Sequence, residues 1–351
     1  MTDINQLLQV TIDRKASDLH ILDGYYPAIR IHNELYAIKI SELVTKELAS
    51  QLLLSILNDE QKGNLLANKE IDFGYSALGY RFRVNMYYTK NSLAASFRLI
   101  PASIKTIDEL GLPPISHEFC NYKQGLVLIT GPTGEGKSTS LASIINKINL
   151  SSAKHIVTIE DPIEFIYPSG NSIISQRELQ QDTHSFNIAL KSVLREDPDI
   201  ILIGEMRDYD TIQAALTIAE TGHLVFSTLH TSTASETVNR VIDVFPPAQQ
   251  NQIRAQLSSS LKAVVSQRLI PNLARNGRVL AAEVLINTPA VASVIRDGKA
   301  FLIDNIIETG EEYKMMLFEK SLAKLYTSGQ ISKETAYAYA FRQNEIKKFV
   351  T

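Results

Sequence analysis

The octapeptide GPTGEGKS at positions 131–138 constrains this chain more than any other segment. It follows the apolar run 125–130 and precedes a helical pattern that extends to about Asn149, so a strand, a glycine-rich loop and a helix are expected in succession. Glycines in such a loop allow successive backbone N–H groups to surround phosphate oxygens, and the positive end of the following helix points at the same site. A glycine-rich turn without a ligand is the alternative, and the strand–loop–helix context argues against it.

The polar side chains of this loop match the chemistry of ATP. Lys137 is expected to neutralise the β- and γ-phosphates, and the Ser138 hydroxyl to ligate Mg²⁺. The predicted nucleotide-binding residues are Gly131, Pro132, Thr133, Gly134, Glu135, Gly136, Lys137, Ser138 and Thr139.

Carboxylates follow two other strand-like runs. Glu205 ends a short apolar run, where a carboxylate is the candidate to orient or deprotonate the attacking water. Glu160, Asp161 and Glu164 follow another such run, and the carboxyl ends of parallel strands form the ligand-binding edge of a sheet. A solvated strand end is the alternative for Glu205. Turn chemistry alone explains Asp161-Pro162, so Glu160 is the stronger functional candidate.

Two histidines bracket one further strand-like run, LVFSTLH. His223 precedes this run and His230 ends it. In a P-loop sheet they are candidates to sense the γ-phosphate, whereas a structural role is the commoner reason for a single histidine. No third ligand lies at short spacing. The single cysteine, Cys120, excludes an internal disulfide and a multi-cysteine zinc site.

The length of 351 residues allows about two domains. Residues 1–100 indicate a small α+β unit, in which 80–88 alternates apolar with polar residues and predicts a strand carrying Arg81 and Arg83 on its free face. Residues 101–117 hold three of the twelve prolines and little periodicity, so we place the domain linker there.

Residues 118–351 form the second expected domain. Apolar runs and helical patterns alternate along it, which is typical of an α/β fold with a mostly parallel sheet and helices on both faces. From about residue 289 the pattern is mainly helical.

Composition narrows the class of protein further. Hydrophobic residues make up 44% and charged residues 21%, which excludes a disordered chain. A net charge of −3 argues against a nucleic-acid partner. The apolar runs are far shorter than the roughly 20 residues of a membrane span. The N-terminus lacks a basic start and an apolar signal core, so we expect a soluble, cytoplasmic protein without a membrane span.

Several long motifs, taken together, resemble the type IV pilus retraction ATPases, the PilT-type secretion-motor family. The resemblance extends from about Ala16 to Lys347, and motifs in the same order are far more specific than the P-loop alone. The motifs are ASDLH (16–20), RFRVN (81–85), ELGLP (109–113), GLVLITGPTGEGKST (125–139), TIEDPIE (158–164), LREDPDIILIGEMRD (194–208), AETGHLVFSTLHT (219–231) and NRVIDVFPPAQQNQIRAQL (239–257).

The resemblance implies a PAS-like N-terminal domain and a RecA-like ATPase domain, assembled into a homohexamer that uses ATP and Mg²⁺. It also implies an acidic Asp box, a catalytic glutamate, a His box with two histidines, and N-terminal arginines that act at the nucleotide. The implied catalytic residues are Glu160, Glu164, Glu205, His223, His230, Arg81, Arg83 and Arg98.

The implied function is a motor at the cytoplasmic face of the inner membrane. It hydrolyses ATP and retracts a type IV pilus, for twitching motility, through an inner-membrane platform protein, with a paralogous retraction ATPase as a further possible partner. The alternatives are an accessory or paralogous secretion-system ATPase, or an assembly scaffold that binds ATP with little turnover. The presence of Glu205 favours an enzyme over a scaffold.

Two positions depart from the family pattern. Glu135 stands where the family usually has a small residue such as serine, and we expect its side chain to point away from the phosphates. Ala292 replaces the first arginine of a box that the family links to retraction, whereas Arg296 of that box is retained.

Overall fold

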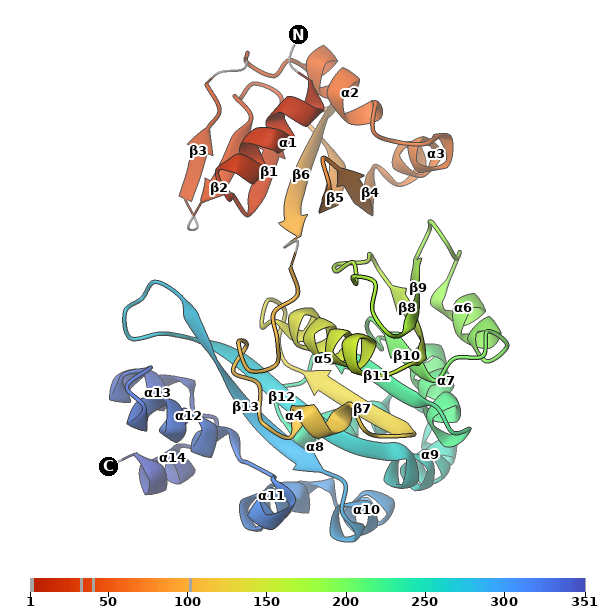
Figure 1. The fold of residues 1–351 in the computed structure, drawn as a ribbon, viewed down its shortest axis with the longest axis vertical. Helices are drawn as coiled ribbons and strands as arrows, with labels where there is room; N and C mark the ends of the chain where they lie inside the picture. The colour runs from red at the N-terminus through yellow and green to blue at the C-terminus, as the bar shows by residue number, and fades with distance from the viewer. Residues whose placement is uncertain (1–2, 32–33, 40–41, 101–102, 351) are drawn as a thin grey trace. The chain divides into compact units, whose positions relative to one another are not determined.

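The computed structural model describes residues 3–31, 34–39, 42–100 and 103–350. The chain divides into two compact units (Figure 1). The first unit contains the chain up to Ser103 together with the short segment Asp161–Ile166. The second contains Ile104–Glu160 and Tyr167 to the C-terminal end.

The first unit is built on a six-stranded antiparallel sheet in the order β3-β2-β1-β6-β5-β4. Helices α1, α2 and α3 contribute to one core with the strands. The elements are α1 (Ile4–Asp13), β1 (Asp18–Ile21), β2 (Ala28–Ile31), β3 (Glu34–Ala37), α2 (Lys46–Leu54), α3 (Asp59–Asn68), β4 (Glu70–Ala77), β5 (Tyr80–Thr89) and β6 (Ser92–Ile100).

Strand β5 confirms the predicted alternation. Phe82, Val84 and Met86 are fully buried in the core that the helices share. Arg81 and Arg83 alternate with these residues and therefore lie on the opposite face of the sheet.

The second unit is built on a seven-stranded sheet in the order β13-β12-β7-β11-β10-β8-β9. All neighbouring strands are parallel except β12 and β13, which form an antiparallel pair. The elements are α4 (Ser116–Phe119), β7 (Gly125–Thr130), α5 (Lys137–Ser151), β8 (His155–Glu160), β9 (Ile173–Glu178), α6 (Phe186–Val193), β10 (Ile200–Ile203), α7 (Tyr209–Glu220), β11 (Leu224–Leu229), α8 (Ala234–Asp243), α9 (Pro247–Ser260), β12 (Leu261–Pro271) and β13 (Arg278–Ile286).

Both faces of this sheet are covered by helices, as the α/β pattern predicts (Figure 1). Along β7, Leu126 and Leu128 belong to the core shared with α6 to α9, whereas Val127 and Ile129 belong to the core shared with α5. Because successive strand residues point to opposite faces, the apolar run is continuous. The β7, β8, β10 and β11 ends therefore meet at one carboxyl edge.

The C-terminal part is helical from Pro289, which confirms the prediction. Its first helix carries Ala292, which is half-buried, and Arg296, which is exposed. The elements are α10 (Pro289–Arg296), η1 (Ala300–Leu302), α11 (Ile303–Thr309), η2 (Glu311–Tyr313), α12 (Phe318–Thr327), α13 (Lys333–Tyr339) and α14 (Gln343–Phe349).

The predicted linker 101–117 needs a correction. Residues 101–102 lie outside the described residues, but Ile107, Leu112 and Ile115 are buried in the core that α5 shares with the sheet. Most of this segment is therefore part of the second unit, because irregular apolar residues can fill a core without a regular period.

Within the described ranges, no helix combines the length and apolarity that crossing a membrane requires.

Candidate nucleotide site

The glycine loop connects the carboxyl end of β7 to α5, and three of its glycines, Gly131, Gly134 and Gly136, have a positive φ. Gly131 has a φ of +146° and Gly136 a φ of +80°, and a Cβ on Gly131 would lie 2.4 Å from the carbonyl oxygen of Gln267. Helix α5 begins at Lys137, and no described side chain caps its first turn. The uncapped N–H groups at this helix start are the donors that bind phosphate oxygens.

Strand β12 extends past the end of β7 and supports the loop. The Gln267 side chain accepts a hydrogen bond from Ser140 Oγ (2.9 Å) and donates one to the carbonyl oxygen of Glu135 (2.7 Å). The backbone N–H of Leu269 donates to the Glu135 carboxylate at 2.5 Å. The Glu135 side chain therefore binds β12. This orientation agrees with the expectation that the side chain points away from the phosphates, which the loop would bind through its backbone N–H groups.

The Lys137 side chain is folded back against the loop. Its Nζ donates to the carbonyl oxygens of Gly131 (2.8 Å) and Pro132 (3.0 Å), and it lies 3.5 Å from Nδ1 of His230. Because the residue is 8% exposed, its positive charge is held close to the loop.

His230 joins the loop to the glutamate that follows β10. Its Nε2 lies 2.8 Å from Oε1 of Glu205, and its Nδ1 lies 3.3 Å from the Thr133 hydroxyl. Lys137 has no acceptor, so the Nδ1 that faces its ammonium must be the accepting nitrogen. In the neutral ring Nε2 then carries the proton, which it donates to Glu205.

Two basic partners hold Glu205 in its ionised form. Its other oxygen, Oε2, lies 2.9 Å from Nη2 of Arg207. Burial acts to raise the pKa of Glu205, but the hydrogen bonds from Arg207 and His230 and the positive charge of Arg207 outweigh burial, so this pKa lies below its ordinary value. An ionised carboxylate can orient water or accept its proton at neutral pH.

Glu160 ends β8 at the same edge of the sheet. Its Oε1 accepts hydrogen bonds from Thr158 Oγ1 (2.7 Å) and Gln176 Nε2 (3.4 Å). Since β10 lies between β8 and β11, Glu160, Glu205 and His230 follow three adjacent strands.

Glu164 belongs to the segment Asp161–Ile166, which groups with the first unit. There its Oε1 lies 3.5 Å from Nη1 of Arg83. The acidic motif 160–164 is thus divided between the two units, which its sequence does not indicate.

The three candidate arginines lie on one face of the first sheet. In the β5–β6 register Arg83 is opposite Arg98, and Arg81 is two residues before Arg83. Arg83 contacts the Asp72 carboxylate with Nη2 (2.6 Å) and Nε (3.1 Å), and Arg98 Nε lies 3.0 Å from Asp18. Arg81 Nε donates to a carbonyl oxygen in the segment Asp161–Ile166. Arg83 is engaged through Nε, Nη1 and Nη2, whereas Arg98 contacts Asp18 through Nε and its side chain is 67% exposed.

His223 lies at the opposite edge of the sheet from His230. Its Nδ1 lies 3.1 Å from Thr221 Oγ1 and 3.3 Å from the carbonyl oxygen of Ile218. The six residues of β11 separate the two histidines by roughly 20 Å. The prediction that both histidines reach the nucleotide therefore needs a correction: residues before and after one strand lie at opposite edges, and only His230 contacts the P-loop of its own chain.

Sequence reasoning missed two residues that hold the site together. Arg207 follows Glu205 by two positions, and Gln267 interrupts an apolar stretch of β12. A polar residue within a buried strand is a signal that was available for Gln267, whereas the pairing of Arg207 depends on a turn after β10.

The residues present fit Mg²⁺ that is bound together with a nucleotide. Ser138 is exposed in the first turn of α5. Among the described residues there is no cluster of three or more His, Cys, Asp or Glu able to hold a metal alone. Mg²⁺ keeps several waters and commonly takes few protein ligands, so one hydroxyl beside phosphate oxygens is an adequate donor set.

A mostly parallel sheet with a P-loop after an inner strand, and with a histidine and a glutamate after the next two strands of the sheet, defines a RecA-like P-loop ATPase. The chain belongs to the family of type II/IV secretion system proteins, whose model matches residues 1–340.

The chain is similar in sequence to proteins that align with 88–95% of its length. A twitching motility protein of Neisseria gonorrhoeae is 47% identical over 88% of this chain and 83% of its own. The type IV pilus retraction ATPase PilT of Pseudomonas aeruginosa is 44% identical over 95% of this chain and 97% of its own. The fold is similar to that in a crystal structure of the pilus retraction motor PilT with bound ADP, with a TM-score of 0.92. The two chains share 41% sequence identity, and the match covers 99% of this chain and 100% of that chain.

Proposed function

We propose that this ATPase is the motor of type IV pilus retraction, and that it acts in twitching motility. The similarity to a pilus retraction ATPase extends over 95% of this chain and 97% of the relative, and this observation carries the proposal. In this proposal the protein is a homohexamer at the cytoplasmic face of the inner membrane. It works on the pilus through an inner-membrane platform protein, with a paralogous retraction ATPase as a further partner.

The site residues take the following roles in the proposal. Lys137 and the N–H groups of the loop bind the β- and γ-phosphates, and Glu205 orients or deprotonates the attacking water. His230 positions Glu205 and responds to the γ-phosphate, because it contacts both Glu205 and the loop. Mg²⁺, held by Ser138, would neutralise charge on the phosphate oxygens.

Residues outside the loop complete the proposed machinery. Glu160, with Glu164, contributes the acidic motif, and an arginine among Arg81, Arg83 and Arg98 reaches the nucleotide. His223 is left out of this site because it lies at the other edge of the sheet.

The direction of the motor can be tested in cells. A strain without this protein should carry excess or longer pili, because extension would continue without retraction. Wild-type protein should restore normal pili, whereas Glu205→Gln should not. Loss of pili in the deletion strain would contradict retraction and indicate assembly, and unchanged pili would indicate an accessory or paralogous role.

The contact between Glu205 and His230 favours an enzyme over a scaffold that binds ATP with little turnover. Steady-state phosphate release from purified protein tests this point. Wild-type release should be well above that of Glu205→Gln, and equal rates near background would support the scaffold.

A further inference from the structure

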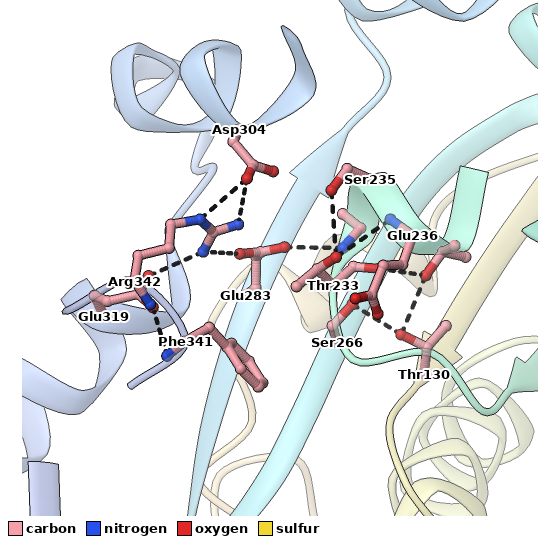
Figure 2. Close-up of polar contacts among 12 residues, drawn as sticks. Thr130, Thr233, Ser235, Glu236, Ser266, Glu283, Asp304, Glu319, Phe341 and Arg342 are labelled. Carbon is pink, nitrogen blue, oxygen red and sulfur yellow. Dashed lines mark hydrogen bonds and ion pairs between the residues drawn. The ribbon is translucent and has the colours of Figure 1, made fainter. Parts of the chain in front are cut away.

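Arg342, between α13 and α14, contacts three carboxylates from three different elements (Figure 2). Its Nη1 lies 3.0 Å from Oε2 of Glu283 on β13 and 3.0 Å from Oε2 of Glu319 on α12. Its Nη2 lies 2.7 Å from Oδ2 of Asp304 on α11. One guanidinium thus joins the C-terminal helices to the sheet of the ATPase unit.

Burial makes this arrangement sensitive to charge. Glu283 and Glu319 are both 0% exposed. Desolvation raises the pKa of Glu283, and the charge of Arg342 opposes part of this effect. A buried carboxylate that loses its counter-charge must take up a proton or move toward water. The position of Glu283 therefore depends on Arg342.

The other oxygen of Glu283 reaches the segment that follows His230. Its Oε1 accepts the backbone N–H of Ala234 at 2.8 Å, and Ala234 is the first residue of α8. A carboxylate is favourable there because it satisfies a free N–H and lies at the positive end of the helix. Ala234 follows His230 by only four positions. The hydrogen bond to Glu283 therefore holds the backbone close to His230 in position.

The first turns of α8 also contact the end of β7. The Thr237 hydroxyl lies 2.7 Å from that of Thr231 and 3.5 Å from that of Thr130, the residue before Gly131. A displacement of this turn would be transmitted to the residue after His230 and to the residue before the loop.

We propose that Glu283 and Arg342 are positioning residues for hydrolysis, and that they couple the C-terminal helices to the catalytic site. Glu283 holds the first turn of α8, and through it His230, in the place where the histidine orients Glu205. Arg342 keeps Glu283 in position, so a movement of the C-terminal helices that withdraws Arg342 slows hydrolysis. The inference rests on the proposed roles of His230 and Glu205.

Two substitutions of Glu283 test the contact with α8. Glu283→Ala removes the acceptor of the Ala234 N–H, whereas Glu283→Gln keeps an oxygen there. We expect kcat for phosphate release to fall about tenfold in the alanine variant and to stay within about threefold of wild type in the glutamine variant. KM and the affinity for fluorescent ADP should change less than about threefold in both, because the loop and Lys137 bind the nucleotide.

Substitution of Arg342 tests the coupling. Arg342→Met should lower kcat about tenfold, and the double variant Glu283→Gln/Arg342→Met should recover most of it because no lone charge remains at Glu283. The loss in Arg342→Met should grow as the pH rises, because a carboxyl group with a raised pKa becomes ionised as the pH rises. The charged groups around Glu283 in that variant are the carboxylates of Asp304 and Glu319.

Lys348→Met is the matched control. Lys348 pairs with Glu308 and Glu345 on the same C-terminal helices, and this variant should hydrolyse ATP like wild type. Circular dichroism at the assay temperature shows which variants are folded. If Arg342→Met is not folded, the comparison of Glu283→Ala with Glu283→Gln decides.

Other results would overturn the inference. They are wild-type kcat in folded Arg342→Met, wild-type kcat in Glu283→Ala, or an equal loss in Lys348→Met. A wild-type rate no higher than that of Glu205→Gln would instead reject the proposed function, so the two failures are distinguishable.

Discussion

The carboxylate of Glu135 links the glycine loop to the sheet through a hydrogen bond to β12. The carboxylate accepts the N–H of Leu269, which belongs to β12 beyond the end of β7. At that point β7 no longer supplies a carbonyl oxygen for the ladder. Both residues are half-buried, and a hydrogen bond contributes roughly 0.5–1.5 kcal/mol, so the Glu135 side chain takes the place of a missing strand residue. A serine side chain at this position would be too short to accept the hydrogen bond from the Leu269 N–H.

Glu135→Ser should therefore loosen the loop even though it removes a negative charge near the phosphates. We expect the affinity for ADP to fall several-fold and the free energy of unfolding to fall by about 1 kcal/mol. Glu135→Gln keeps the accepting oxygen without the charge, so it should bind ADP at least as tightly as wild type. Calorimetric titration and urea unfolding measure both quantities. Tighter binding by Glu135→Ser would show that charge repulsion outweighs the hydrogen bond.

Glu205→Gln should bind ATP nearly as well as wild type but hydrolyse it about 10²-fold or more slowly. The amide cannot accept a proton, and it loses the charge that Arg207 and His230 stabilise. Single-turnover phosphate release and nucleotide titration separate the two effects. Glu196→Gln, which alters an ion pair with Arg177, is the control and should leave the rate unchanged. Turnover of Glu205→Gln within about threefold of wild type would remove Glu205 from the catalytic residues.

Single residues of the site could be predicted where a motif assigns a role to a position. Lys137, Glu205 and His230 are such residues, and the structure brings them together. A polar residue within a buried strand singles out Gln267, but its role could not be assigned, because that role depends on which strand lies beside the loop and no spacing in the sequence encodes that neighbour. His223 was assigned from a motif that does not distinguish the two ends of a strand.

At the scale of elements, the buried parallel strands were predictable and the strand pair at the edge was not. Residues 125–130, 155–160 and 200–203 are mostly apolar runs, as expected for strands that are covered on both faces. Strand β12 contains Ser266, Gln267 and Arg268, and the polar residues obscure its pattern. Because its carboxyl end supports the loop, the strand that was missed is part of the site.

Gln267→Ala tests that support. The side chain is 1% exposed and makes hydrogen bonds to Ser140 and Glu135, so its loss should lower the free energy of unfolding by about 2 kcal/mol. We also expect weaker binding of ADP, because the loop loses a contact with β12. Gln256→Ala, which alters an exposed hydrogen bond to Glu220, is the control and should change neither quantity. Unchanged affinity in Gln267→Ala would show that the loop keeps its shape without β12.

For the whole molecule, the sequence correctly indicated two units but not the composition of each. Residues Asp161–Ile166 follow β8 in the second unit and yet group with the first. The motif 158–164 reads as one acidic stretch, and only the fold shows that its two glutamates have different surroundings.

Arg81 and Arg83 share a sheet face with Arg98. If they form only surface ion pairs, each pair is worth about 0–1 kcal/mol and hydrolysis does not depend on them. If one of them reaches the nucleotide of a neighbouring chain, Arg83→Ala or Arg81→Ala should fold normally and lose most hydrolysis, since an arginine in this role is worth about 10³–10⁵-fold in other P-loop enzymes. Circular dichroism and phosphate release measure the two quantities, with Arg14→Ala, an exposed arginine of the same unit, as the control.

Mixing experiments then decide whether the arginine acts between chains. In a ring that contains both an arginine variant and Lys137→Ala, some sites combine an intact loop with an intact arginine from the neighbour. Such mixtures should therefore regain part of the activity that each variant lacks alone, and phosphate release measured across mixing ratios should pass through a maximum. Loss of activity without recovery would assign the arginine to its own chain. Full activity in both arginine variants would show that the carboxylate pairs at Arg83 are structural, and Arg98→Ala would be the next variant to measure.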